Sequence, residues 1–109
     1  MYDDAQVRRV TADENAASNG LVTNNVVVRI HKVAITGDGS NIVSVDIHDD
    51  TNASNAALIK ISVSGNTDIS GKFDQFVQAD YYPPVEYTKG VSLNLTGNTA
   101  VVYVYYTKK

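Results

Sequence analysis

Residues 91–106 read VSLNLTGNTAVVYVYY, and this stretch decides the fold class. Two runs rich in β-forming residues flank a short Gly-Asn-Thr segment at 97–99, which is typical of a hairpin. The first run alternates strictly, so Val91, Leu93 and Leu95 share one side of a strand and polar residues share the other. The second run is apolar on both sides, and we therefore expect both of its faces to be covered.

Similar short runs recur along the rest of the chain, separated by turn residues. The expected strands are 6–12, 26–35, 41–48, 57–63, 68–73, 91–96 and 100–106. There is almost no helical signal, and a parallel sheet would need crossover helices between its strands. We therefore predict an all-β protein with a single antiparallel β-sandwich, jelly-roll-like, of about seven short strands. This domain is expected over 26–109, after an N-terminal arm or loop over 1–25 that contains the first short strand.

The alternation slips in the longest of these runs, residues 26–35. Val28 and Ile30 lie on one side of the strand, whereas Val33 and Ile35 lie on the other. A β-bulge that shifts the register by one residue would place all four on the same face. We therefore expect a bulge within this strand.

The expected core residues alternate with polar residues along three strands. They are Val43, Val45, Ile47, Ile59, Ile61, Val63, Leu93 and Leu95. The substitution Ile61→Ala is expected to lower the free energy of unfolding by about 2–5 kcal/mol, through transfer and cavity terms. Residues 74–90 are expected to form a loop, because its two prolines could not sit in a central strand.

Composition limits the classes of partner. The 109 residues suffice for one domain, and they include no cysteine, so neither disulfides nor thiolate metal sites can form. The net charge of −3 argues against a nucleic-acid partner, whose phosphates require a basic face. Residues 1–6 lack the features of a signal peptide, and no apolar run approaches the ~20 residues that span a bilayer. We therefore expect neither a nucleic-acid nor a membrane partner.

No catalytic, metal or cofactor site is predicted. Ser44, Asp46 and His48 share one face of a strand, but the serine and the histidine would stand roughly 13 Å apart, too far for a nucleophile and its base. Asp46 and His48 are expected to be an exposed polar pair. The oxygen-rich segments 38–41 and 49–52 lack the spacing of a calcium-binding EF-hand loop. We therefore expect that the protein is not an enzyme.

The strongest candidates for a functional surface are aromatic and apolar residues near the C-terminus. If the second run of the opening stretch buries Val102 and Val104, then Val101, Tyr103 and Tyr105 face outward. Soluble monomers seldom leave such a contiguous patch uncovered. Tyrosine combines a large apolar body with a polar tip, which suits protein interfaces and sugar stacking. By the same reasoning, Tyr81 and Tyr82 are interface candidates in the expected loop.

The chain resembles a group of small β-sandwich proteins encoded among bacteriophage structural genes. The segments that carry the resemblance are 33–35 with 47–50, 56–61, the Gly-led strand and Thr-Gly turn of 89–97, and the tyrosine-rich 102–106. These segments lie within residues 26–107. The resemblance is one of strands and turns, and it transfers no functional residue.

This resemblance implies a virion structural protein, most specifically a capsid decoration or cement subunit that stabilises the head through protein–protein contacts. The uncovered patch of Val101, Tyr103 and Tyr105 predicts a homo-oligomer, and the resemblance makes a trimer the first expectation. The resemblance also implies contacts with the major capsid protein or other virion proteins. The protein would be made in the host cytoplasm and act in the phage particle. The alternative is a glycan-binding module of a phage tail or fibre, which exposed Tyr81 and Tyr82 beside an oxygen-rich loop would favour. A secreted carbohydrate-binding domain of a cell is a third hypothesis.

Overall fold

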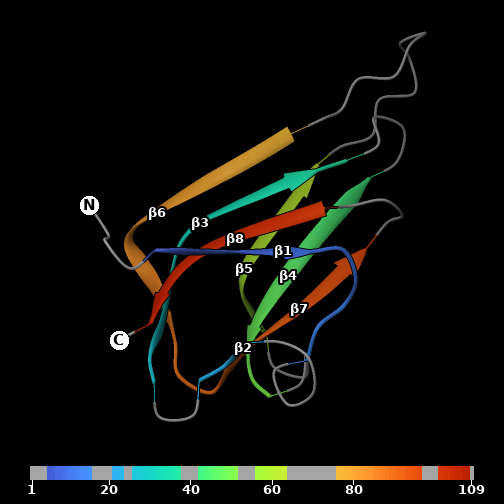
Figure 1. The fold of residues 1–109 in the computed structure, drawn as a ribbon. Coiled ribbons are helices and arrows are strands. Elements are labelled where there is room, and N and C mark those ends of the chain that lie inside the picture. Colours follow the sequence, from blue (N-terminus) through green and yellow to red (C-terminus); the bar gives the residue numbers. More distant parts are fainter. Residues whose placement is uncertain are drawn as a thin grey trace, which may run out of the picture.

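Two antiparallel sheets pack face to face in the computed structural model (Figure 1). The structure describes residues 5–15, 21–23, 26–37, 42–51, 56–63, 76–96 and 101–108. The strands are β1 (Gln6–Val10), β2 (Leu21–Val22), β3 (Val28–Thr36), β4 (Val43–Asp49), β5 (Ala57–Val63), β6 (Phe76–Tyr87), β7 (Gly90–Thr96) and β8 (Val101–Lys108). The strand order is β1-β8-β3-β6 in the first sheet and β2-β7-β4-β5 in the second.

The strand pairings are nested. β1 pairs with β8, β2 with β7, β3 with β6 and β4 with β5, and every pair is antiparallel. The predicted all-β antiparallel sandwich is therefore confirmed. Because β2 has only two residues, the described part of the second sheet has three full-length strands beside the four of the first. The jelly-roll form stays a prediction.

The predicted β-bulge in the third strand is confirmed. The register of β3 shifts between Ile30 and Lys32 against both of its neighbours, β6 and β8. This shift lets the residues on either side of it face the same core, because side chains alternate strictly along an unbroken strand. Ile30, Val33 and Ile35 are accordingly fully buried.

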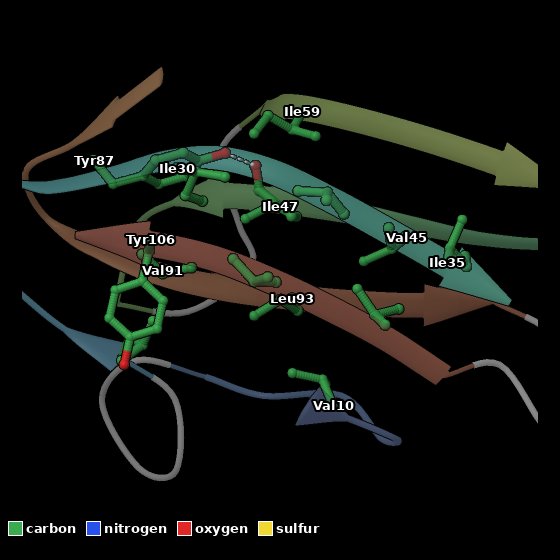
Figure 2. Packing of buried hydrophobic residues seen from close by; sticks show 14 of the residues in the cluster. Val10, Ile30, Ile35, Val45, Ile47, Ile59, Tyr87, Val91, Leu93 and Tyr106 are labelled. Carbon is green, nitrogen blue, oxygen red and sulfur yellow. Dashed lines mark hydrogen bonds between the residues drawn. The ribbon is translucent and has the colours of Figure 1, made fainter. Parts of the chain in front are cut away.

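Most of the predicted core is confirmed. Six of its members have an exposed fraction of at most 3 %, and Figure 2 shows several of them between the sheets. These six are Val43, Val45, Ile47, Ile59, Val63 and Leu93. Ile61 and Leu95 are only partly buried and pack against the cluster from its margin. Ile61 belongs to β5, which ends the second sheet, and Leu95 is the next-to-last residue of β7.

The predicted hairpin between the last two strands is wrong. Both strands exist, but β7 lies in the second sheet beside β4, and β8 lies in the first sheet beside β3. The chain therefore changes sheets between them. Alternation reports only which side of a strand is buried, so two strands that face one core from opposite sheets show the same pattern as a hairpin.

The predicted loop at 74–90 is also wrong, because residues 76–87 form the long strand β6. β6 ends the first sheet, and an edge strand can accommodate proline since one side of its backbone needs no partner. Residues 81–84, which include both prolines, lie opposite the single residue His31 in the pairing with β3. The expectation that neither proline sits in a central strand is therefore confirmed.

The N-terminal segment joins both sheets. The short strand expected over 6–12 is β1, whose Val10 is buried against the core (Figure 2). Glu14 then forms a bridge to Leu93 of β7, with backbone hydrogen bonds of 2.9 and 2.8 Å. The Arg8 guanidinium meets the Glu14 carboxylate at 2.7 Å, which links the edges of the two sheets. The weak strand predicted at 68–73 and the turn at 97–99 lie outside the described residues.

Candidate interaction surface

The outer side of the first sheet carries the predicted interface residues of the final strand. Along β8, Val102 and Val104 are fully buried, whereas Val101, Tyr103 and Tyr105 point the other way and are half-buried. The face assignment made from the alternation is therefore confirmed for the described residues. No described strand lies over this outer side (Figure 1).

Tyr105 occupies the centre of one row across this face. Val7 of β1 lies on one side of it and Lys32 of β3 on the other, and Lys32 is followed by Asp80 of β6. The Lys32 ammonium lies over the Tyr105 ring, 5.0 Å from its centroid, as in a cation–π contact. Val7 is 54 % exposed, which makes it the apolar end of the row.

Tyr103 lies in the next row. Its neighbours are Arg9 of β1 and Ala34 of β3, and Ala34 is followed by Gln78 of β6. Ala34 carries only a methyl group and is almost fully covered. We call the outward side of β1, β8, β3 and β6 in these two rows the outer tyrosine face; it consists of Val7, Arg9, Lys32, Ala34, Gln78, Asp80, Tyr103 and Tyr105.

Charge is unevenly distributed around the outer tyrosine face. The cations Arg9 and Lys32 lie on β1 and β3, whereas the carboxylates Asp80 and Glu86 lie on the edge strand β6. Beyond the two rows, the Arg29 guanidinium of β3 meets the Glu86 carboxylate at 2.8 Å. The β1 side of the face is therefore basic and the β6 side acidic.

Tyr81 and Tyr82, the other interface candidates, have different surroundings. Tyr82 is 92 % exposed on the edge strand β6. Tyr81 packs against the core cluster, and burial raises the pKa of its phenol. The structure therefore offers one exposed ring at this position and not the exposed pair that a sugar-stacking site would use.

Asp49, the last residue of β4 and the first of the oxygen-rich segment 49–52, stabilises a turn. One oxygen of its carboxylate accepts hydrogen bonds from the backbone N–H groups of Thr88 (3.0 Å), Lys89 (2.7 Å) and Gly90 (3.3 Å). Close by, the buried Tyr87 hydroxyl donates to the carbonyl oxygen of Ile47 at 2.8 Å (Figure 2). Burial raises the pKa of the Tyr87 phenol strongly. These contacts join β4 to the connection between β6 and β7, so they serve the fold.

Ser44, Asp46 and His48, the polar residues compared above with a catalytic or metal site, all lie on β4. His48 is only 7 % exposed, so the predicted exposed pair of Asp46 and His48 is wrong for the histidine. Asp46 is flanked by Lys60 of β5 and Asn94 of β7. Among the described residues, no group of three or more histidines and carboxylates is placed to hold a metal ion. A search of the same residues for a helix long and apolar enough to cross a membrane finds none.

The charge pattern of the outer tyrosine face was missed by sequence reasoning. Arg9, Lys32 and Asp80 are far apart in the chain, and only the strand order β1-β8-β3-β6 brings them together with the tyrosines. Because β6 was assigned to a loop, Asp80 had no predicted face. A comparison of the chain with protein-family models, curated proteins and solved structures finds no match.

Proposed function

We propose that the protein is a structural protein of a bacteriophage particle, most specifically a capsid decoration or cement subunit. It acts by binding other proteins, namely further copies of itself and the major capsid protein or other virion proteins. The observation that carries this proposal is the outer tyrosine face, where Tyr103 and Tyr105 project from a central strand of the first sheet. A patch of this kind on a soluble protein commonly marks a protein-binding surface.

The composition of the face supports protein contacts over other partners. Tyrosine and arginine are enriched at protein interfaces, and both occur here beside the exposed Val7. The negative net charge does not suit nucleic acid. The resemblance to small phage β-sandwich proteins supplies the virion setting, and the fold itself is common to many functions.

The proposal is tested on phage particles. Mass spectrometry of purified particles should detect the protein, and the recombinant protein should bind particles that lack it. The double variant Tyr103→Asp with Tyr105→Asp should lose this binding, because it replaces two aromatic rings of the face by charged groups whose desolvation on binding is costly. Leu58→Asp is the matched control, since Leu58 is 54 % exposed on the other sheet. Equal binding by the double variant would contradict a role for the outer tyrosine face, and absence from the particles would contradict the proposed function.

A glycan-binding module of a phage tail or fibre is the second candidate, and the exposed Tyr82 ring favours it. Sugar rings stack on exposed aromatic faces, but Tyr81, the expected second platform, packs against the core. The discriminating experiment is a glycan-binding screen of the wild-type protein and of Tyr82→Ala. Saccharide binding that depends on Tyr82 would favour this alternative over the decoration role.

A further inference from the structure

We infer that two copies of this chain pair through their outer tyrosine faces, with the two-fold axis parallel to the strands. This inference rests on the proposed function, since it specifies how the self-association is built. It replaces the expected trimer by a dimer, because a face that packs on itself forms an isologous contact that closes at two copies.

The arrangement follows from how a two-fold axis maps the sheet onto itself. An axis that runs parallel to the strands, between β8 and β3, reverses the strand order but keeps each row at its own height. β6 of the second copy then lies over β1 of the first, and β3 of the second copy lies over β8 of the first. An in-plane axis perpendicular to the strands would instead place each strand over its own copy and reverse the rows.

Charge selects between the two arrangements. With the parallel axis, the basic β1 edge meets the acidic β6 edge of the other copy, and this contact occurs twice. Arg9 then lies one row, about 7 Å along the strand, from Asp80 of the second copy, within the reach of its side chain. With the perpendicular axis, β1 meets β1, and the two Arg9 side chains are brought toward each other. Like charges placed together at an interface are costly, so the parallel axis is favoured.

The centre of the face is also complementary in the parallel arrangement. Tyr105 of one copy lies over Lys32 of the other, so each Lys32 ammonium has a tyrosine ring on its own chain and one across the interface. Tyr103 lies over Ala34, the position that projects least from the face. In the perpendicular arrangement, β8 lies over β8, and bulky tyrosines oppose each other.

The size of the face indicates a weak pair. β3 has nine residues, and at about 3.3 Å per residue and about 4.8 Å between strands the four-stranded face measures roughly 30 by 19 Å. This footprint of roughly 570 Å² is below the ~800 Å² per partner of a standard interface. Aligned sheets pack about 10 Å apart with interdigitating side chains, which gives the tyrosines room between the copies.

The test is a charge swap measured by sedimentation equilibrium with the full chain. Wild-type protein should show a monomer–dimer equilibrium. Arg9→Glu alone should weaken pairing roughly 10- to 100-fold, because both contacts then place two carboxylates together, and Asp80→Arg alone should do the same by placing two guanidinium groups together. An equimolar mixture of the two variants should recover the dimer, because both contacts of the mixed pair then join opposite charges. One contact joins the native Arg9 to the native Asp80, and the other joins the two substituted residues. Native mass spectrometry identifies that dimer as one copy of each variant.

Thermal melts and Lys60→Glu serve as controls. Lys60 is exposed on the other sheet, so its reversal should leave the dimer unchanged. A melt close to that of wild type shows that Asp80→Arg, which lies beside Lys32 of its own chain, still folds. If it does not, Asp80→Asn takes its place; it should weaken pairing by less than Arg9→Glu, because it removes the charge contact without placing like charges together. A wild-type monomer or trimer at about 100 μM, or variants that pair as well as wild type, would overturn the inference. The proposed function would survive any of these results if the protein is still found in purified particles.

Discussion

The substitutions Ile59→Ala and Ile61→Ala form a matched pair that tests the core. Both residues lie on β5 and face the same core, but Ile59 is 2 % exposed and Ile61 lies partly open at the margin of the cluster. Each change removes three side-chain carbons. If these carbons are fully buried, the lost transfer free energy is about 2.4 kcal/mol, at ~0.8 kcal/mol per carbon. The cavity that remains at Ile59 raises its cost to about 3–4 kcal/mol. Ile61→Ala should cost about 1–1.5 kcal/mol, below the range that the sequence suggested, because part of its side chain already contacts water.

The assay is urea denaturation followed by circular dichroism, with thermal melts in parallel. At about 4 °C per kcal/mol, the midpoint should fall by roughly 12–16 °C for Ile59→Ala and by roughly 4–6 °C for Ile61→Ala. Lys60→Ala is the control between them, and its exposed side chain should change stability by no more than ~0.5 kcal/mol. Equal losses at the two isoleucines, or a larger loss at Ile61, would refute the assignment of Ile59 to the centre of the core and Ile61 to its margin.

Three further predictions use polar groups. Asp49→Ala should lower the free energy of unfolding by about 1.5–3 kcal/mol, because three backbone N–H groups lose a charged acceptor, and Asp46→Ala, on the same strand, should cost less in the same urea titration. Tyr87→Phe should cost about 1 kcal/mol through the lost hydrogen bond to the Ile47 carbonyl, and a neutral result would show that this bond does not stabilise the fold. Burial and the nearby Arg29 lower the pKa of His31 in the folded state. The stability contributed by its neutral form is therefore fully present above the unfolded pKa of about 6.5, and it is lost as the pH drops from there toward the lower folded pKa. His31→Gln should remove that part of the pH dependence, and an unchanged stability-versus-pH curve would contradict the lowered pKa.

Side-chain periodicity predicted what each strand buries. The alternation of Val43, Val45 and Ile47 identified their buried face, and the slip near Ile30 identified the bulge, because both depend only on neighbouring residues along one strand. Burial of every second residue of β8 followed in the same way.

Periodicity could not predict which strands pair. Leu93 and Val104 face one core from different sheets, and nothing in their local patterns separates that arrangement from a hairpin. β6 was missed because prolines exclude a central strand but not an edge strand, and edge position depends on the whole topology. His48 lies on the expected outer face of β4 and is nevertheless buried, which alternation alone cannot show. The charge pattern of the outer tyrosine face could not be predicted for the same reason, because its charged residues come from three strands whose pairing was unknown.

The edges of the sandwich give a reason to expect association through a face. An open sandwich exposes edge strands, and unpaired backbone at such edges promotes strand addition unless charge or proline opposes it. In the first sheet, the edge strand β6 carries Pro83 and Pro84 and the opposite edge strand β1 carries Arg8 and Arg9. In the second sheet, the edge strand β5 has Lys60 at its centre and the edge strand β2 has only two residues. Each of these features disfavours an added strand. We therefore expect an assembly through the described surfaces to use a sheet face. Of the two outer faces, only that of the first sheet combines tyrosines with cations on one side and carboxylates on the other.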